Sequence, residues 1–345
     1  MNKNFFVKKK ILVTGASGSI GSEVVNQLLK KNCKVIRGIS NDENGIYDLT
    51  EKFSRNKIFS KKNIITHMSK SRIRYLVGDI RDFDRCLEST RGIDVVIHSA
   101  AMKHVPICEY NKKETYKTNV IGTKNLIKAC LANKVKKFLL ISTDKAVYPT
   151  SYMGYTKKLA EKLVLSQNRK SINKCKFSVI RFGNVIGSRG SVLLKFINQI
   201  KNNQEITVTH KEMTRFFISI ESAVKKVLES ILMMRGGEVF IIKNLKAFKI
   251  IDLAYALKKI YNSRSKVIVI KPHENEKLFE QMLHKNELNQ IDIIKNLFFL
   301  NKNFKTKKIK DSDLSIYREL NSGFAKRLNR TQIMFFLKNN KLLNL

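Results

Sequence analysis

The chain has 345 residues, and 67 Lys and Arg against 28 Asp and Glu give it a formal net charge of +39 at pH 7. This length can bury a full core in one or two domains, and the absence of an apolar run of about 18 residues argues against a transmembrane segment. The basic start, Met1 to Lys10, lacks the apolar region of a signal peptide. The five cysteines are scattered, with no CxxC pair and no histidine at metal-ligand spacing, so we expect no metal site and a cytoplasmic protein with reduced thiols.

The positive charge has two explanations. It can indicate a nucleic-acid or anionic-membrane partner, or it can be a solvated coat of lysines in a chain rich in Lys, Asn and Ile. Basic residues run from the N-terminus to Lys341 rather than gathering in one tail. This spread favours the second explanation, and we expect no nucleic-acid partner.

The first strand, predicted from Lys10 to Thr14, runs directly into a turn with glycines at 15, 18 and 21. Helix periodicity follows from Ser22 to Lys31. Gly15 permits the tight turn, Gly18 lets a pyrophosphate approach the backbone, and Gly21 lets helix and strand pack closely. With the helix N-terminus as an anion site, this pattern predicts dinucleotide binding by a set of turn residues: Gly15, Ser17, Gly18, Ser19, Ile20 and Gly21.

The second strand, Cys33 to Ile39, ends at Ser40. An acid there would favour NAD and a nearby Arg would favour NADP, but Ser40 is neither and Asp42 comes two residues late. Both cofactors therefore stay open. The polar residues from Ser54 to Ser71 are expected to form an inserted surface loop or short helix.

The third strand, Ile73 to Val77, is followed by Asp79 and Ile80. Asp79 is placed to hydrogen-bond an adenine amino group, with Ile80 packing on the ring. The alternative is that Asp79 caps the helix that starts near Asp82, and the sequence does not choose between them.

The fourth strand runs from Asp94 to His98. Small residues after it, including Ala100 and Ala101, would let a dinucleotide pass close to the backbone. Lys103 and His104 would then face a substrate, although a single His is more often structural. A long helix is predicted from Glu114 to Asn133.

The fifth strand, Lys136 to Ile141, leads into Ser142-Thr143-Asp144-Lys145-Ala146, and a helix begins near Met153. Open parallel sheets place their chemistry at such strand ends. Asp144, Lys145 and, on the following helix, Lys157 would bring a proton donor, a proton acceptor and a cofactor-orienting cation into one crevice.

Alternating helices and strands predict an α/β fold with a Rossmann-type, doubly wound parallel sheet and a smaller α/β substrate-binding region. We expect the dinucleotide domain mainly in residues 1–180, the substrate region mainly in 181–290, and a basic tail packing on it in 291–345. Further elements are expected at Phe177–Ile180, Ser191–Lys201, Ile220–Met234, Val239–Ile242, Ile250–Tyr261, Lys266–Ile270 and, as two short helices, Asp313–Leu337.

Several ordered motifs resemble those of extended short-chain dehydrogenase/reductases, and most closely the UDP-N-acetylglucosamine 4,6-dehydratases of polysaccharide biosynthesis. They span roughly residues 10 to 285 and include the glycine turn, Ala100-Ala101-Met102-Lys103-His104-Val105-Pro106, Ser142-Thr143-Asp144-Lys145-Ala146, Met153-Gly154-x-Thr156-Lys157, Met213-Thr214-Arg215-Phe216 and Glu276-Lys277-Leu278. Some relatives carry an N-terminal membrane region; this chain resembles a soluble short form.

The resemblance implies a reaction with a tightly bound, recycled NAD or NADP. Hydride leaves C4 of the sugar, water is lost across C5 and C6, and hydride returns to C6. It further implies that Lys145 is the C5 base, that Asp144 is the acid at C6, that Thr143 contacts the 4-oxygen and that Lys157 holds the nicotinamide ribose. Lys145 can act as a base near neutral pH only if its pKa is lowered.

Met153 departs from the pattern of most such enzymes, which have a Tyr four residues before the Lys. A thioether cannot accept the C4 hydroxyl proton. Tyr152 and Tyr155 do not have that spacing from Lys157. One branch of the dehydratases similarly has Met here, and the resemblance places this chain in that branch, with Asp144 or a water left as the proton acceptor.

The resemblance also implies substrate contacts in the second half. Asn184 and Arg189 match positions that hold the sugar nucleotide, and Glu276 matches a ribose contact. Arg215 is expected to clamp the diphosphate, with a structural salt bridge as the alternative. His273 and Asn275 replace an Arg and a Gly that relatives often carry.

Two other functions stay open. A nucleotide-sugar 4-epimerase on the same fold would need the hydride step but no acid and base at C5 and C6. A catalytically inactive reductase fold that binds RNA through its charge would show salt-sensitive binding and no sugar turnover. Asp144 and Lys145 favour the dehydratase, for which we expect a UDP-sugar substrate and a homo-oligomer.

Overall fold

The computed structural model describes residues 4–53, 72–169, 174–272, 274–294, 297–301 and 311–343. The chain divides into two compact units, and neither is continuous in sequence. The first unit comprises Met1–Ser142, Thr156–Ile180 and Val224–Val239, and the second comprises Thr143–Tyr155, Arg181–Ala223 and Phe240–Leu345. The continuous ranges predicted from the sequence differ from these units because the chain crosses between them several times.

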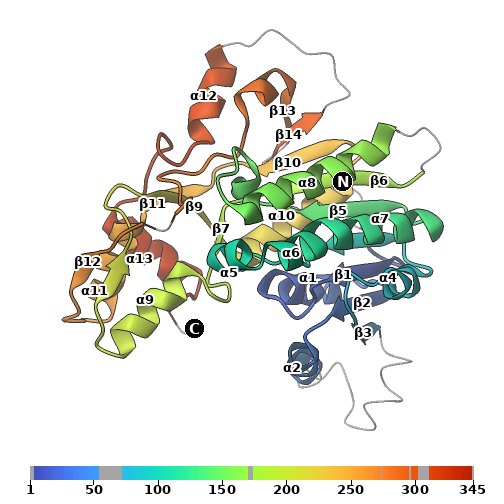
Figure 1. The fold of residues 1–345 in the computed structure, drawn as a ribbon, viewed down its shortest axis with the longest axis horizontal. Coiled ribbons are helices and arrows are strands. Elements are labelled where there is room, and N and C mark those ends of the chain that lie inside the picture. Colours follow the sequence, from blue (N-terminus) through green and yellow to red (C-terminus); the bar gives the residue numbers. More distant parts are fainter. Residues whose placement is uncertain are drawn as a thin grey trace. The chain divides into compact units, whose positions relative to one another are not determined.

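The first unit is built on a parallel sheet (Figure 1). Its strands follow the order β6-β5-β4-β1-β2-β3, with the start of β10 (Glu238–Ile242) beyond β6. Every register within this series is parallel. The strand bounds are Lys10–Thr14 for β1, Val35–Ser40 for β2, Ile73–Val77 for β3, Val95–His98 for β4, Lys137–Ile141 for β5 and Lys176–Arg181 for β6.

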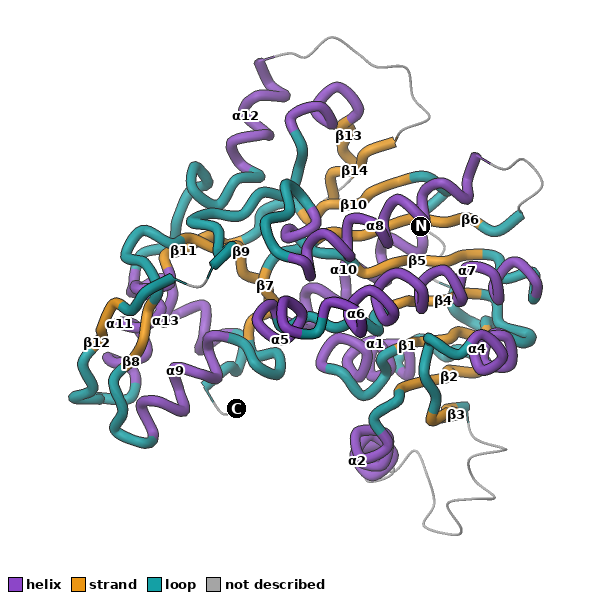
Figure 2. The backbone as a smooth tube through the Cα atoms, viewed as in Figure 1, coloured by secondary structure: helices purple, strands orange, loops and turns teal. Residues whose placement is uncertain are grey.

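Helices flank this sheet (Figure 2), and α1, α2 and α7 each bury an apolar face. In α1, for example, the buried face comprises Val24, Val25, Leu28 and Leu29. The helices are α1 (Ser19–Leu29), α2 (Glu43–Phe53), α4 (Phe83–Thr90), α5 (Val105–Tyr110), α6 (Lys112–Tyr116), α7 (Gly122–Ala132), most of α8 (Tyr152–Ser166), the short 3-10 turn η4 (Gln167–Arg169) and most of α10 (Ile220–Met233).

The predicted helix from Glu114 to Asn133 is not one regular helix. It is divided into α6, a π-helical segment η2 (Lys117–Ile121) and α7. The π segment contains Asn119, whose side chain bonds to other elements, as described below. Such segments are frequent at functional sites.

The second unit contains several small sheets. β7 (Asn184–Ile186), β9 (Thr214–Ser219) and β11 (Lys246–Lys249) form one, and β8 (Ile206–Val208) pairs in parallel with β12 (Val267–Val269). β13 (Ile291–Ile294) and β14 (Leu297–Asn301) form an antiparallel pair, with β14 next to β10. Its helices are η3 (Asp144–Ala146), α9 (Val192–Lys201), α11 (Ile250–Ile260), η5 (Lys285–Gln290), α12 (Asp311–Glu319) and α13 (Arg330–Asn339).

The core of the second unit gathers around stacked rings. Phe217 and Phe248 lie parallel with centroids 4.0 Å apart, and Phe336 of α13 contacts Phe248 edge-on at 6.3 Å. Ile333 and Leu337 of α13 are buried in the same cluster. The C-terminal helix is therefore part of the core of this unit.

The structure confirms the α/β class and the mostly parallel, Rossmann-type sheet. α1 begins at Ser19, three residues before the predicted start, and β7, β8, β9, β11, β13 and β14 were not predicted. The predicted insertion at residues 54–71 and the substitution at His273 lie outside the described residues. Within the described part of the chain, no helix combines the length and apolarity needed to cross a membrane.

Candidate active site

The glycine turn of the first unit leaves no room for side chains. Gly15 has a φ of +64°, and a Cβ there would lie 2.8 Å from Ala100 Cα. A Cβ on Gly21 would lie 2.1 Å from the Gly15 oxygen, so α1 starts in direct contact with the turn. The amides of its first turn have no acceptor within the helix, which makes this end suited to a phosphate group. Ser17 is buried, and its hydroxyl is 2.8 Å from that of Ser40 at the end of β2.

A buried histidine supports the small residues after β4. His98 lies between two threonine hydroxyls, 2.8 Å from Thr14 Oγ1 and 3.0 Å from Thr123 Oγ1. Burial lowers its pKa to about 3, so it is neutral at pH 7. Because the Thr123 hydroxyl donates to the Asn119 carbonyl, we assign the His98 proton to Nε2, and Nδ1 accepts from Thr14. Thr14 Oγ1 in turn accepts from the Ala100 amide at 3.2 Å.

Asn119 ties three segments of the first unit together. Its Oδ1 accepts from the Met102 amide at 2.9 Å, and its Nδ2 donates to the Met102 carbonyl at 3.1 Å and to Thr156 Oγ1 at 3.0 Å. The segment carrying Ala100 and Ala101 is thereby held to α8. Lys103 and His104 follow it and are exposed.

Asp79 and Ile80 lie in the loop after β3. Asp79 accepts hydrogen bonds from the Arg81 amide at 2.9 Å and the Arg81 Nε at 2.8 Å. Burial would raise the pKa of Asp79, but these bonds and the Arg81 charge lower it overall. The helix cap is Asp82, which accepts from the Arg85 amide, so the alternative role considered for Asp79 belongs to Asp82. Ile80 is buried against Gly122 of α7.

Lys157 is buried in the first unit. Its Nζ donates to the Ile141 carbonyl at the end of β5, at 2.7 Å. Desolvation lowers its pKa from 10.5 to about 8. An amine held in this way suits the expected role of binding a ribose hydroxyl.

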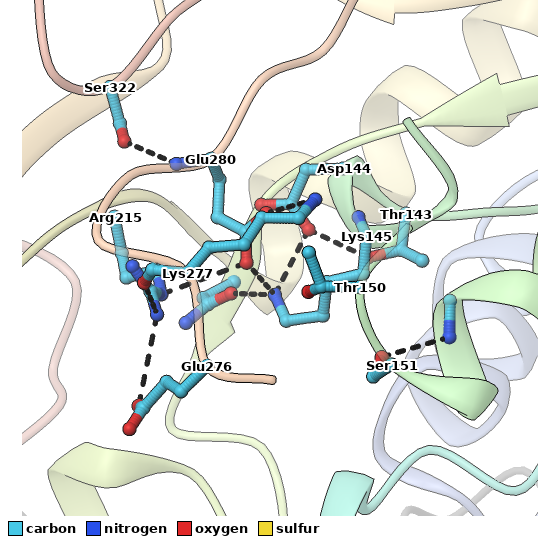
Figure 3. Close-up of polar contacts among 12 residues, drawn as sticks. Thr143, Asp144, Lys145, Thr150, Ser151, Arg215, Glu276, Lys277, Glu280 and Ser322 are labelled. Atoms are coloured by element: carbon cyan, nitrogen blue, oxygen red, sulfur yellow. Dashed lines mark hydrogen bonds and ion pairs between the residues drawn. The ribbon is translucent and has the colours of Figure 1, made fainter. Parts of the chain in front are cut away.

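The second unit gathers five ionisable side chains, which we call the charged cluster: Asp144, Lys145, Arg215, Lys277 and Glu280 (Figure 3). Asp144 and Lys145 lie in η3, a turn capped by Thr143. Arg215 comes from β9, and Lys277 and Glu280 come from the segment after β12.

Lys145 makes three polar contacts at its Nζ. The distances are 3.0 Å to Asp144 Oδ1, 2.9 Å to Asn184 Oδ1 and 3.5 Å to Glu280 Oε1. Burial alone would lower the pKa of Lys145, but the two carboxylates raise it overall, so the lowered pKa expected of a base near neutral pH is not found here. The structure thus brings Asn184 to Lys145, which the sequence did not predict.

Asp144 is fully buried. Its Oδ1 accepts from Thr143 Oγ1 at 2.8 Å as well as from Lys145, while Oδ2 has no hydrogen-bond partner among the described residues. Burial raises the pKa of Asp144 despite the neighbouring ammonium. A buried carboxyl with one uncommitted oxygen is suited to donating a proton.

Arg215 is also buried. Its guanidinium donates to the carbonyls of Thr214 at 2.8 Å and Lys277 at 2.7 Å, and pairs with Glu276 and Glu280 at 3.8 Å each. Arg215 therefore already has two carboxylate partners, as the structural ion pair expected as the alternative to a diphosphate clamp requires. Glu276 keeps one oxygen, Oε2, without a hydrogen-bond partner among the described residues.

Met153 and Arg189, which were also predicted as site residues, differ in exposure. Met153 is buried in the first turn of α8. Arg189 is exposed in the loop between β7 and α9. Sequence reasoning did not identify Thr14, His98 or Glu280 as site residues. A signal for Glu280 existed, since it follows the Glu276-Lys277-Leu278 motif by two residues.

A family model described as "Polysaccharide biosynthesis protein" matches residues 11–302. The chain belongs to this family. An uncharacterized membrane protein of Methanocaldococcus jannaschii is 41% identical over 97% of both chains. A UDP-glucose 4-epimerase of Rickettsia bellii is 36% identical over 85% of this chain and 83% of its own.

Among solved structures, Pen from Bacillus thuringiensis has a TM-score of 0.87 and 35% identity, covering 98% of this chain and 99% of its own. A dTDP-glucose 4,6-dehydratase from Streptomyces venezuelae, solved with NAD, has a TM-score of 0.66 and 19% identity over 78% of this chain and 86% of its own. At that identity the likeness shows the fold alone. The chain is thus similar in sequence to a protein named as a UDP-glucose 4-epimerase, and it shares its fold with a 4,6-dehydratase.

Proposed function

We propose that the protein is a UDP-N-acetylglucosamine 4,6-dehydratase of polysaccharide or glycan biosynthesis that uses NAD or NADP. The close-packed glycine turn and the N-terminus of α1, where the cap residue Gly18 makes no side-chain cap hydrogen bond, support binding of a dinucleotide by the first unit. When bound, the dinucleotide would accept hydride from C4 of the sugar and return it to C6.

One observation carries the choice of reaction. Lys145 and Asp144 are joined by a 3.0 Å hydrogen bond, and the second oxygen of Asp144 is uncommitted among the described residues. A 4-epimerase needs no acid and base at C6 and C5, so it would have no use for this pair. Dehydration needs both.

The pair can supply both groups without an outside proton. A shift of one proton along the hydrogen bond converts the ion pair into a neutral carboxylic acid on Asp144 and a neutral amine on Lys145. Burial of Asp144 favours this form, whereas the charges of Asp144 and Glu280 oppose it by raising the pKa of Lys145. The amine then takes the C5 proton, and the carboxylic acid gives its proton to the departing C6 hydroxyl, which restores the ion pair.

The proton count closes over the full reaction. Two protons leave the sugar, from the C4 hydroxyl and from C5, and two return, one in the released water and one at C5. Thr143, which bonds Asp144 Oδ1, is the proposed contact of the 4-oxygen. The C4 hydroxyl proton goes to a water, because Met153 has no group that could accept it and Asp144 in its neutral form already carries a proton.

The test is incubation with UDP-N-acetylglucosamine and NAD or NADP, followed by mass spectrometry of the nucleotide sugar. We expect a product that has lost one water. Conversion to the galacto sugar at unchanged mass would contradict the proposal and establish the 4-epimerase, the activity for which the Rickettsia bellii relative is named.

Replacing Lys145 with Ala tests the assignment of the base. We expect the rate of water loss to fall by at least about 100-fold, the low end of what a general base contributes, with cofactor binding retained. Lys249→Ala is the matched control, since this lysine of the second unit pairs with Glu212 at 2.8 Å. Normal turnover by Lys145→Ala would show that another group removes the C5 proton.

A further inference from the structure

Glu280 is a buried carboxylate surrounded by three cations. It is 2% exposed. Its Oε1 lies 3.5 Å from Lys145 Nζ and 3.8 Å from Arg215 Nε, and its Oε2 lies 3.3 Å from Lys277 Nζ. A charge this deeply buried is tolerated only because it is paired. Through these ion pairs, Glu280 connects Lys145 to Arg215 and Lys277.

The backbone of Glu280 is fixed by the C-terminal segment. Its amide donates to Ser322 Oγ at 2.9 Å, and the Ser322 amide donates to the Glu280 carbonyl at 2.9 Å. The Met282 amide continues this pairing by donating to the Leu320 carbonyl at 3.0 Å. Figure 3 shows Ser322 reaching Glu280 from the opposite side to Lys145.

Ser322 also reaches the strand that carries Arg215. Its fully buried hydroxyl lies 3.0 Å from Thr214 Oγ1 and 3.2 Å from the Thr214 carbonyl. One serine therefore joins the segment of Glu280 to the residue preceding Arg215. The tail after residue 310 contributes to the site as well as to the core.

We propose that Glu280 is a positioning residue, which holds Lys145 in line with Asp144 and Asn184, and that Ser322 fixes Glu280 in place. The meaning of this for catalysis rests on the proposed dehydratase function. Without the Glu280 carboxylate, Lys145 would keep Asp144 and Asn184 as partners, and the positive charge of Arg215 facing it would be uncompensated.

The titratable groups that face Lys145 and Glu280 come from η3, from β9 and from the segment after β12. Lys145 of η3 faces Asp144, Glu280 and Arg215, and Glu280 faces Lys145, Arg215 and Lys277. The negative charge of Glu280 raises the pKa of both Lys145 and Asp144. Removing that charge should move both limbs of the pH–rate profile toward lower pH.

The test is the pH dependence of kcat for Glu280→Gln, which keeps the shape of the side chain and removes its charge. We expect both limbs to move by about 1 to 2 pH units, as a charge 3.5 Å away and partly screened by other cations would require. We also expect kcat to fall by about tenfold or more as Lys145 loses its alignment. Glu280→Asp keeps the charge, so it should retain the wild-type limbs with a lower kcat.

Ser322→Ala tests the second half of the proposal. It leaves the Glu280 charge in place, so we expect a several-fold loss of kcat without movement of the limbs. The matched control is Glu287→Gln, which removes another buried glutamate of the second unit, paired with Arg181 at 2.9 Å. Unmoved limbs in Glu280→Gln, an equal shift in Glu287→Gln or a wild-type kcat in Ser322→Ala would overturn the proposal.

A titration of Lys145 by NMR of labelled lysine side chains, with the signal assigned by Lys145→Arg, gives a readout that needs no turnover. Glu280→Gln should lower the midpoint of this titration. If the wild type removes no water and the midpoint still moves, the dehydratase proposal fails and the role of Glu280 stands. If water is lost and neither the midpoint nor the limbs move, the role of Glu280 fails and the dehydratase stands.

Discussion

Lys157 shows how strongly burial acts on a single side chain. Its amine bonds the Ile141 carbonyl, and its pKa of about 8 lies well below the ordinary 10.5. At neutral pH the folded chain therefore holds an ammonium that would be better solvated in the unfolded chain. This unfavourable charge is retained at the position where the sequence predicts a ribose contact.

Replacing Lys157 with Met should reveal this cost. Between pH 8 and 10.5 the unfolded wild type binds a proton that the folded wild type has lost, so its free energy of unfolding should rise with pH. Relative to Lys157→Met, the wild type should gain roughly 3 kcal/mol across this window, since one pKa unit is about 1.4 kcal/mol. Urea unfolding of both proteins at several pH values measures it. A difference that does not change with pH would show that Lys157 is not perturbed.

Among single residues, the sequence predicted those that lie inside motifs and missed the residues that form bonds to them. Asp144, Lys145 and Lys157 could be named because they follow a predicted strand at fixed spacing. Glu280 and Ser322 could not be assigned a role, because they meet Lys145 and Thr214 only through the tertiary fold. His98 belongs to a predicted strand, and its threonine partners come from β1 and α7.

The start of α8 is pressed against the turn that carries Lys145. A Cβ on Gly154 would lie 2.3 Å from the Lys145 carbonyl oxygen and 3.2 Å from Pro149 Cβ. Neither neighbour is the end of a flexible side chain. The glycine in the Met153-Gly154 motif therefore lets the start of α8 and the turn η3 approach closely.

Gly154→Ala should displace this turn. We expect turnover to fall at least about tenfold, because a shift of the order of 1 Å misaligns Lys145, and stability to fall by about 1–3 kcal/mol, as for other overpacked sites. Tyr155→Ala is the control, since the neighbouring side chain is largely exposed. Kinetic assays and thermal unfolding measure both effects. Wild-type turnover in Gly154→Ala would show that the turn can adjust.

Among the elements, the long periodic helices and the buried parallel strands of the first unit could be predicted, and β7 and β14 could not. β7 has only three residues, and β14 is a short apolar run that periodicity alone does not distinguish from a helical segment. The predicted helix is interrupted at η2, the segment that contains Asn119, whose side chain bonds to Met102 and Thr156; no local pattern shows these contacts.

The charge of the whole molecule has a physical consequence independent of its site. A net charge of +39 on 345 residues opposes compaction through self-repulsion. Added salt screens this repulsion, because the Debye length falls from about 30 Å at 0.01 M to about 8 Å at 0.15 M.

We therefore expect Tm to rise by a few degrees between these two salt concentrations. Scanning calorimetry in NaCl measures the shift, and sucrose at equal osmolarity is the control for effects unrelated to charge. A Tm that stays constant or falls with NaCl would show that repulsion between positive charges does not limit the stability of the folded chain.

The hydrogen bonds that join Ser322 to Glu280 and Thr214 form late in the synthesis of the chain. Asp144 and Lys145 leave the ribosome well before Glu280, which follows 135 residues after Lys145, and before Ser322. The first unit likewise needs the distant stretch Val224–Val239. A nascent chain therefore carries its proposed acid and base long before it can align them, because alignment must wait for the segment around Ser322 to be synthesised.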